Sequence, residues 1–153
     1  MPRWEIGDVD ALIESTLAND AIIKTKMGIT TGKARVANTR VPSPKDKTWN
    51  ALYIYFYCIP GPDAPGQGTR RIQSNPDYDI EVRTLGAPTD DSEAIVDRID
   101  ELIGTMTRTL TPSGHWVVSA RRVRPIHMTQ PGESTEVFYT RRGATYKLAV
   151  VSS

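Results

Sequence analysis

Few side chains in this 153-residue chain could do metal or nucleophilic chemistry, and their spacing favours neither. His115 and His127 stand at the two ends of one expected strand, on the same face but far apart along it. Neither belongs to an HxxxH, HxH or HExxH pattern, which would bring two imidazoles onto one metal ion. Cys58, the only cysteine, lies in an apolar segment and fits a small buried side chain better than a nucleophile. We therefore predict no metal site and no cofactor.

The acidic residues of segment 90–101 could supply two carboxylates for general acid–base chemistry. Helical spacing, however, places them on the polar face of an amphipathic helix, where solvated carboxylates are far commoner than catalytic pairs. No GxSxG, Walker-type or GxGxxG sequence occurs, so the sequence indicates neither an activated serine nor a phosphate-binding loop. We expect that the protein is not an enzyme.

Three arginine doublets, at residues 70–71, 121–122 and 141–142, are interleaved with aromatic residues, a pattern also seen in nucleic-acid-binding proteins. Adjacent residues of a strand point to opposite faces of its sheet, which separates the two charges of each doublet. The formal net charge of +1 gives no global preference for nucleic acid. We interpret the arginines as ion-pair donors at sheet edges and interfaces, for which the acidic helix offers partners. If the basic strands of one subunit met the acidic helix of a neighbour, the contact would be head-to-tail, of the kind that closes into a ring.

The elements that position these residues fit one domain, which we assign to residues 1–153. The composition is ordinary, with 39% hydrophobic and 24% charged residues. The first ten residues lack the apolar core of a signal peptide, and no apolar run approaches the length of a membrane span. We expect a soluble protein made in a reducing cytoplasm, with no membrane partner.

The first expected element is a short amphipathic helix over residues 8–19, with Asp8 as its N-cap. We then expect flexible loops at residues 28–48 and 60–69. The first of these includes a weak edge strand or extended arm. The second is so rich in proline and glycine that residues 60–68 should form neither strand nor helix.

The most strand-like segment is TWNALYIYFYCIP, at residues 48–60. One of its faces is apolar and should pack on the helices, while the other is a stripe of three tyrosines, Tyr53, Tyr55 and Tyr57. Exposed amphipathic aromatics are typical of protein contact surfaces. A loop or strand of the same chain could equally cover them, and the sequence favours neither alternative.

The clearest local structure runs from Tyr78 to Met106. A strand over residues 78–83 alternates apolar and charged side chains, as in a sheet with only one buried side. After a Gly-Ala-Pro turn, Asp90 and Glu93 resemble a capping box at the start of an amphipathic helix. The apolar stripe of this helix consists of Ile95, Ile99, Leu102, Ile103 and Met106. Its opposite face carries the acidic residues, which include Asp97, Asp100 and Glu101.

Two further strands complete the pattern, separated by a PGES turn. In the first, Trp116, Val118 and Ala120 should share one face and Val117 the other, whereas Gly143 in the second suggests a bulge or a turn. The order is helix, weak strand, strand, strand, helix, strand, strand. It predicts an α+β domain: an antiparallel, at most mixed, β-sheet with two main helices packed on one face.

This arrangement resembles the tail terminator (tail completion) proteins of long-tailed bacteriophages. The resemblance covers most of the chain and is one of element order and hydrophobic pattern, because the family has no invariant catalytic motif. The matching segments are DVDALIESTLAND, ALYIYFYCI, YDIEVRTLGAPTDDSEAIVDRIDELI, WVVSARRVRPI and TYKLAVVSS. The sequence departs from the usual pattern at residues 28–47 and 60–68.

The resemblance implies a virion structural protein of the phage tail or neck, assembled in the cytoplasm of a bacterial host. A homo-hexameric ring would cap the tail tube protein, stop tube polymerisation and present a surface to the head–tail connector or stopper protein. DNA would pass through the ring without specific binding. Residues that we expect at a subunit interface or channel are Tyr53, Tyr55, Tyr57, Asp97, Asp100, Glu101, Arg121, Arg122, Arg141 and Arg142. Residues that we expect in a loop docking on the tail tube are Asp63 and Gln67.

Two alternatives stay open at this point. A head-closure or stopper protein, or another neck component, would have the same composition. A different class of function is an α+β nucleic-acid-binding module that uses the arginine doublets and exposed tyrosines. A salt-dependent gel shift would favour the second alternative, and a hexamer without affinity for DNA would reject it.

Overall fold

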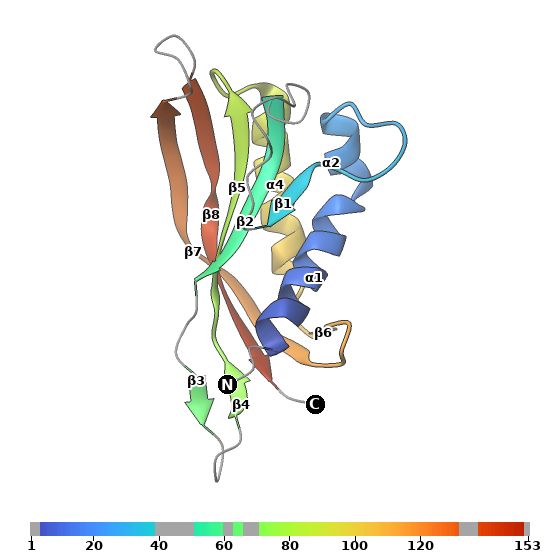
Figure 1. The fold of residues 1–153 in the computed structure, drawn as a ribbon, viewed down its shortest axis with the longest axis vertical. Helices are drawn as coiled ribbons and strands as arrows, with labels where there is room; N and C mark the ends of the chain where they lie inside the picture. Colours follow the sequence, from blue (N-terminus) through green and yellow to red (C-terminus); the bar gives the residue numbers. More distant parts are fainter. Residues whose placement is uncertain (1–3, 39–50, 60–62, 66–70, 132–137, 152–153) are drawn as a thin grey trace.

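The computed structural model describes residues 4–38, 51–59, 63–65, 71–131 and 138–151 (Figure 1). In chain order the elements are α1 (Trp4–Ala18), α2 (Ala21–Lys26), β1 (Val36–Asn38), β2 (Leu52–Ile59), β3 (Asp63–Pro65), β4 (Arg71–Ser74), β5 (Asp77–Leu85), α4 (Asp90–Gly104), β6 (Thr109–Leu110), β7 (Trp116–Pro131) and β8 (Phe138–Val151). The expected order of helices and strands is present, with the additional short elements α2, β3, β4 and β6.

The described strands form one curled sheet around β8. One edge of β8 pairs with β5 and then with β4, and its other edge pairs with β7. β2 lies outside β5, and β1 lies outside β2. All of these pairs are antiparallel except β1 with β2, so the sheet is mixed. The weak strand expected before residue 48 is therefore present, as a parallel edge strand of three residues.

An arm of two short strands, β3 and β4, projects beyond the body of the molecule (Figure 1). β3 pairs with β4, and β4 pairs with the end of β8 at Val150 and Val151. The expectation that residues 60–68 contain no strand is therefore wrong for residues 63–65. Pro65 is tolerated because β3 lies at the edge of the sheet, where a missing N–H does not interrupt a ladder.

One face of the sheet carries the apolar core. Tyr78, Ile80 and Val82 of β5 are fully buried there, as the alternating pattern predicted. The stripe of α4 faces the same core, and Ile95, Ile99, Ile103 and Met106 are buried. From α1, the core receives Val9, Ile13 and Leu17. The prediction of helices beside a sheet is confirmed, and the finer one, of two main helices packed on one face, stays a prediction.

Both predicted helix starts are displaced in the structure. α1 begins at Trp4, so Asp8 is not its N-cap but lies within the helix. In α4 the N-cap is Thr89, and the capping box joins it to Ser92 instead of joining Asp90 to Glu93. The reason is that the hydroxyl oxygen of Ser92, at the third helical position, can accept a hydrogen bond from the backbone N–H of Thr89, as the carboxylate of Glu does in the commoner box.

β7 contains two bulges, between Val117 and Ser119 and between Arg122 and Arg124. Each bulge inserts one residue and reverses the alternation of faces beyond it. The predicted grouping of Trp116, Val118 and Ala120 is therefore wrong, because Val117 and Ala120 pair with Val150 and Leu148 and so lie on the core side. The bulge suggested at Gly143 is absent. That glycine lies in regular pairing with strands on both sides.

Candidate subunit-contact surfaces

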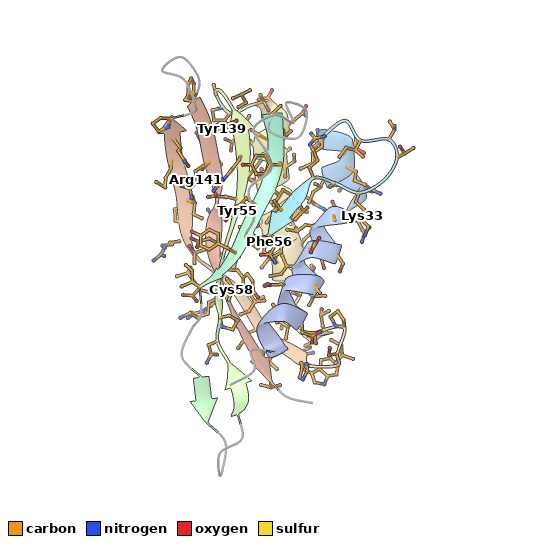
Figure 2. The ribbon with its side chains drawn as sticks, viewed as in Figure 1. Lys33, Tyr55, Phe56, Cys58, Tyr139 and Arg141 are labelled. Atoms are coloured by element: carbon orange, nitrogen blue, oxygen red, sulfur yellow. The ribbon has the colours of Figure 1, made fainter. Side chains whose placement is uncertain are left out.

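The three tyrosines of β2 lie on the side of the sheet opposite to the apolar core. Antiparallel partners share a face, and the partners of Tyr53, Tyr55 and Tyr57 are Arg83, Glu81 and Asp79. The same register continues across β8 and β7. We call this side of the sheet the tyrosine face: Tyr53, Tyr55, Tyr57, Asp77, Asp79, Glu81, Arg83, Leu85, Tyr139, Arg141, Thr145, Lys147, Trp116, Arg121, Arg124, Ile126 and Met128. Figure 2 shows Tyr55 and Arg141 on the strands that flank β5.

A buried carboxylate lies at the centre of the tyrosine face. Glu81 has no exposed surface, and both of its oxygens accept hydrogen bonds from Nε of Arg141 at 3.0 Å. Arg83 donates to the same carboxylate at 2.7 Å. The expectation that only one side of this strand is buried is therefore wrong. A buried carboxylate is tolerated here because two guanidinium groups compensate its charge.

The tyrosines are tied to this ionic cluster. The guanidinium of Arg83 lies 4.2 Å from the ring centroid of Tyr55, a cation–π contact, and donates to the Tyr53 hydroxyl at 3.4 Å. The Tyr57 hydroxyl donates to Asp79 at 2.6 Å, which together with burial raises the pKa of Tyr57 to about 12. Each tyrosine of the stripe thus contacts a charged side chain of its own chain.

Two of the arginines predicted at a subunit interface pair with α4 of the same chain. Arg142 lies 3.0 Å from Glu93, and Arg122 lies 3.8 Å from Asp100. Asp100 also accepts a hydrogen bond from the Tyr146 hydroxyl at 2.8 Å, and burial with this bond raises the pKa of Tyr146. The basic strands and the acidic helix therefore do meet, within one subunit, along the side of α4 next to the sheet.

The outward side of α4 keeps a line of exposed carboxylates. Asp90, Asp97 and Glu101 recur at i, i+7 and i+11, which places them on one stripe opposite to the buried isoleucines. We call these three residues the acidic stripe. Glu101 receives a hydrogen bond from Arg98 at 2.9 Å, whereas no ion pair of Asp90 or Asp97 is seen within the described ranges.

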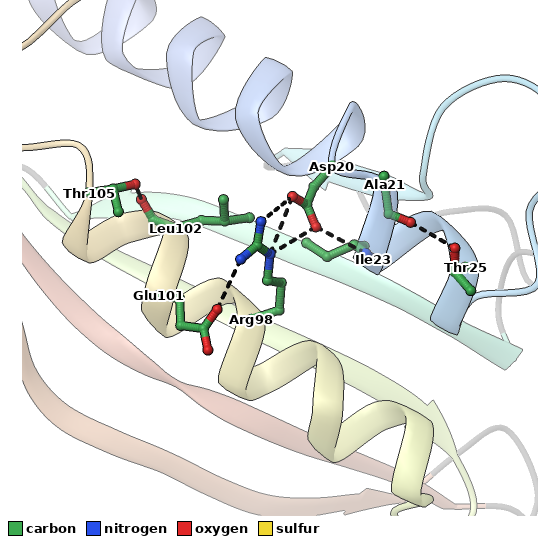
Figure 3. A network of polar contacts seen from close by, with 8 residues as sticks. All are labelled: Asp20, Ala21, Ile23, Thr25, Arg98, Glu101, Leu102 and Thr105. Carbon is green, nitrogen blue, oxygen red and sulfur yellow. Dashed lines mark hydrogen bonds and ion pairs between the residues drawn. The ribbon is translucent and has the colours of Figure 1, made fainter.

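Arg98 joins α4 to the N-terminus of α2 (Figure 3). Its guanidinium donates to Asp20 at 2.8 Å and to Glu101 at 2.9 Å. Asp20 is also the N-cap of α2 and accepts from the backbone N–H of Ile23 at 3.1 Å. The hydrogen bonds from Arg98 are the main reason why the pKa of Asp20 lies below its ordinary value of 3.8.

Asp20 should therefore make stability depend on pH in the acid range. The pKa of Asp20 is lower in the folded chain than in the unfolded chain, where it is 3.8. Its contribution to the free energy of unfolding is therefore complete above pH 3.8 and is lost as the pH falls through the pKa of the folded chain. The difference in free energy of unfolding between the wild type and Asp20→Asn should be largest above about pH 4. Below that pH the difference should become smaller. Urea titrations between pH 2 and pH 6 measure this difference. A difference that stays constant with pH would contradict the assignment, and Glu14→Gln, which changes an exposed carboxylate of α1, is the control.

A second polar cluster joins α1 to the turn before β7. Asp8 accepts hydrogen bonds from the Thr111 hydroxyl and from the backbone N–H of Ser113 at 2.9 Å, and lies 3.0 Å from Nδ1 of His115. Burial by itself raises the pKa of Asp8, but the bonds from Thr111, His115 and Ser113 together hold it below its ordinary value. Thr111 and Asp8 approach the same ring nitrogen of His115. This arrangement holds the turn before β7 in place. It differs from a catalytic triad, in which the nucleophile and the carboxylate contact opposite nitrogens of the histidine ring.

The remaining predicted residues lie in different places. His127 is exposed in the middle of β7, so the two histidines do not bracket the strand as expected. Arg121 is exposed on the tyrosine face, Asp63 begins β3, and Gln67 lies outside the described residues. Within the described ranges there is no group of three His, Cys, Asp or Glu side chains that could hold a metal ion. In the same ranges, no helix has the length and apolar character needed to cross a membrane.

Sequence reasoning did not assign a role to several residues of the tyrosine face. Asp79, Glu81 and Arg83 were expected on a solvated side of the strand, yet they form the ionic cluster. A signal was available in the sequence: Glu81 and Arg83 are two residues apart on one strand face, opposite three tyrosines. Arg124 lies on the same face as Arg121 only because of the second bulge, and the sequence pattern did not predict that bulge.

Comparisons with known proteins show the fold alone. No protein-family model matches the chain, and no curated protein matches it. One solved structure with a similar fold is a chain of the virion of a native gene transfer agent (GTA) particle. It is 14% identical, with a TM-score of 0.53, and the match covers 94% of this chain and 97% of that chain. Another solved structure, which carries no functional name, is 13% identical, with a TM-score of 0.53. That match covers 93% of this chain and 94% of the other chain.

Proposed function

We propose that this protein is a structural component of a virion and, more specifically, a tail terminator that forms a ring at the head-proximal end of a phage tail tube. The observation that carries the proposal is the shared fold, over nearly the whole length of both chains, with a chain of the GTA virion. The element order that resembles the tail terminator family gives independent support, because it rests on the sequence pattern alone.

The geometry suits a ring of identical subunits. A closed ring needs two different, complementary patches on each subunit. The tyrosine face and the acidic stripe of α4 are two such patches, because α4 packs against the core side of the sheet while the tyrosine face is the other side. We propose a homo-hexamer, as the resemblance implies, with Asp97 and Glu101 at a subunit contact or lining the channel. DNA would pass an acidic lumen without being bound.

The arm of β3 and β4 is our candidate for docking on the tail tube protein. A projecting two-stranded hairpin has little core of its own and gains stability when a partner covers it. The ring face on the other side would meet the head–tail connector or stopper protein. Asp63 is the first residue of β3 on this arm, in a strand and not in the loop that we expected, and its docking role stays a proposal.

Electron microscopy of the purified protein tests the proposed function directly. We expect rings with a central hole, and we expect added rings to stop the growth of tubes of the matching tail tube protein. A protein that stays monomeric at micromolar concentration in moderate salt would contradict the ring. Rings that leave tube growth unchanged would instead favour the alternative of a head-closure, stopper or other neck protein.

Shortening the arm should separate folding from docking. We expect that replacing residues 61–73 by a short turn leaves the subunit folded and the ring intact, because the arm contacts the body mainly through the last two residues of β8. Capping of tail tubes should fall at least tenfold. Circular dichroism and light scattering check fold and ring, and a tube-length assay checks capping. A variant that caps tubes normally would show that the arm is not the docking element.

One observation favours a function of another class. Arg121 and Arg124 are exposed on a face rich in tyrosine, which is a feature of nucleic-acid-binding modules. A salt-dependent gel shift with duplex or single-stranded DNA would support this alternative. A ring that shows no shift would reject it.

A further inference from the structure

The tyrosine face carries a surplus of positive charge at its β7 side. Its basic residues are Arg83, Arg121, Arg124, Arg141 and Lys147, and its acidic residues are Asp77, Asp79 and Glu81, so five positive charges face three negative ones. Glu81 pairs with Arg83 and Arg141, and Asp77 lies 3.7 Å from Lys147. Arg121 and Arg124 are exposed, and within the described ranges neither forms an ion pair. These two arginines are therefore available to an acidic partner.

Exposed apolar side chains flank the arginines on the same face. Trp116, which is 41% exposed, precedes Arg121 on β7, and Met128, which is 52% exposed, follows Arg124. Protein contact surfaces combine such apolar side chains with charged ones. The β7 side of the tyrosine face thus combines the two features of a protein interface, apolar area and uncompensated charge.

The acidic stripe of α4 has the complementary charge. Between Asp90 and Gly104 the helix carries six carboxylates and one arginine, a formal charge of −5. Glu93 and Asp100 are neutralised by Arg142 and Arg122 of the same chain, but Asp90 and Asp97 are not. The neighbouring helix α2 also exposes a large apolar side chain, Ile22, which is 47% exposed.

The spacing of the charges is similar. Asp90 and Asp97 are seven residues apart on a helix, which corresponds to about 10 Å. Arg121 and Arg124 pair with Lys147 and Thr145, which are two residues apart on β8, so the backbones of the two arginines lie about 7 Å apart. The long arginine side chains can span the remaining difference. The bulge matters because it turns both arginines to the same face, where their partners are Lys147 and Thr145. Without it, the two charges would lie on opposite sides of the sheet.

We propose that the β7 side of the tyrosine face receives the acidic stripe of α4 from a second copy of this chain, with Arg121 and Arg124 opposite Asp97 and Asp90. The two surfaces lie on opposite sides of the subunit, so the contact is head-to-tail and each copy uses both surfaces. This inference deepens the proposed ring and rests on it. It assigns the acidic stripe to the subunit contact and not to the channel.

Charge reversal on each surface tests the pairing. The sheet variant, Arg121→Glu with Arg124→Glu, has two acidic surfaces, and the helix variant, Asp90→Lys with Asp97→Lys, has two basic surfaces. We expect each variant alone to fold but to need at least a tenfold higher concentration to assemble than the wild type. Mixed in equal amounts, the two should form rings of alternating subunits. A single chain with all four changes should also assemble. Lys33→Glu and Glu14→Lys, at exposed positions elsewhere, each reverse one charge of either sign and are the controls for a general effect of charge.

Light scattering coupled to size exclusion gives the mass of each sample, and circular dichroism checks the fold. If the wild type forms rings and both variants form them equally well, the pairing is wrong while the proposed ring stands. If the wild type itself is a monomer, the ring and the pairing are both overturned. If the sheet variant only loses affinity for DNA in a gel shift, the exposed arginines serve nucleic acid instead.

Discussion

The Glu81→Leu variant is expected to lose about 3 kcal/mol of its free energy of unfolding. The substitution removes the one carboxylate that Arg83 and Arg141 share, and it leaves two guanidinium groups facing each other on a largely buried surface. The total free energy of unfolding of a domain of this size is only about 5–15 kcal/mol, so this loss is a large part of it. Urea unfolding followed by circular dichroism measures it.

Two comparisons separate the charge from the packing at this position. Glu81→Gln keeps the size of the side chain and should cost less than Glu81→Leu, because an amide oxygen still accepts one hydrogen bond. Glu101→Gln changes a carboxylate that is 67% exposed, and its effect should stay within about 0.5 kcal/mol. Equal stability of Glu81→Leu and Glu101→Gln would show that the ionic cluster does not support the sheet.

Adding one methyl group at Gly143 should lower the free energy of unfolding at least as much as Glu81→Leu does. A Cβ atom at this position would lie 2.0 Å from the carbonyl oxygen of Ile80 and 2.8 Å from Cα of Glu81. Both atoms belong to the backbone of β5, so no side chain can move aside and the two strands would have to separate. We expect Gly143→Ala to lose more than about 4 kcal/mol or to yield no folded protein.

Gly7→Ala is the matched control for this substitution. Gly7 lies within α1, and a Cβ atom there would have no neighbour within 4 Å. Since alanine favours a helix over glycine, this variant should gain about 0.5–1 kcal/mol. Thermal and urea unfolding of both variants provide the comparison. A Gly143→Ala protein that unfolds at the wild-type urea concentration would mean that β5 and β8 are not in such close contact.

The parts of the fold that sequence predicted are those with a strong local period. The stripe from Ile95 to Met106 recurs at helical spacing and is buried as expected, because a helix of that pattern has only one way to cover its apolar side. Tyr78, Ile80 and Val82 are likewise buried together. In both segments the local pattern and the tertiary environment require the same orientation.

The tyrosine face could not be predicted, because its chemistry depends on contacts between distant segments. A charged residue that alternates with apolar ones normally lies in water, and Glu81 is buried only since Arg141, 60 residues later, lies beside it. The sequence raised two alternatives for the tyrosines, an open surface or cover by the same chain. Tyr53 is buried, whereas Tyr55 and Tyr57 are partly exposed, so each alternative holds for part of the stripe.

The faces of β7 were predicted wrongly for a different reason. A bulge adds one residue without any characteristic side chain at Val118 or Val123, so a strict alternation assigns everything after it to the wrong side. The same limit applies to the candidate contact residues. The sequence correctly separates Arg121 from Arg122 by strand alternation, but only the bulge brings Arg124 onto the face of Arg121.

The central position of β8 has a consequence for the order in which the subunit is made. β8 is the last strand described, yet it lies between β5 and β7 and joins the two halves of the sheet. During translation, residues 77–131 are complete before the strand that connects them emerges from the ribosome. Since β5 and β7 have no pairing with each other, the sheet can close only in a late, long-range step. Partly synthesised chains would thus lack the part of the tyrosine face that β7 and β8 form together, and with it one of the two surfaces that the proposed subunit contact needs.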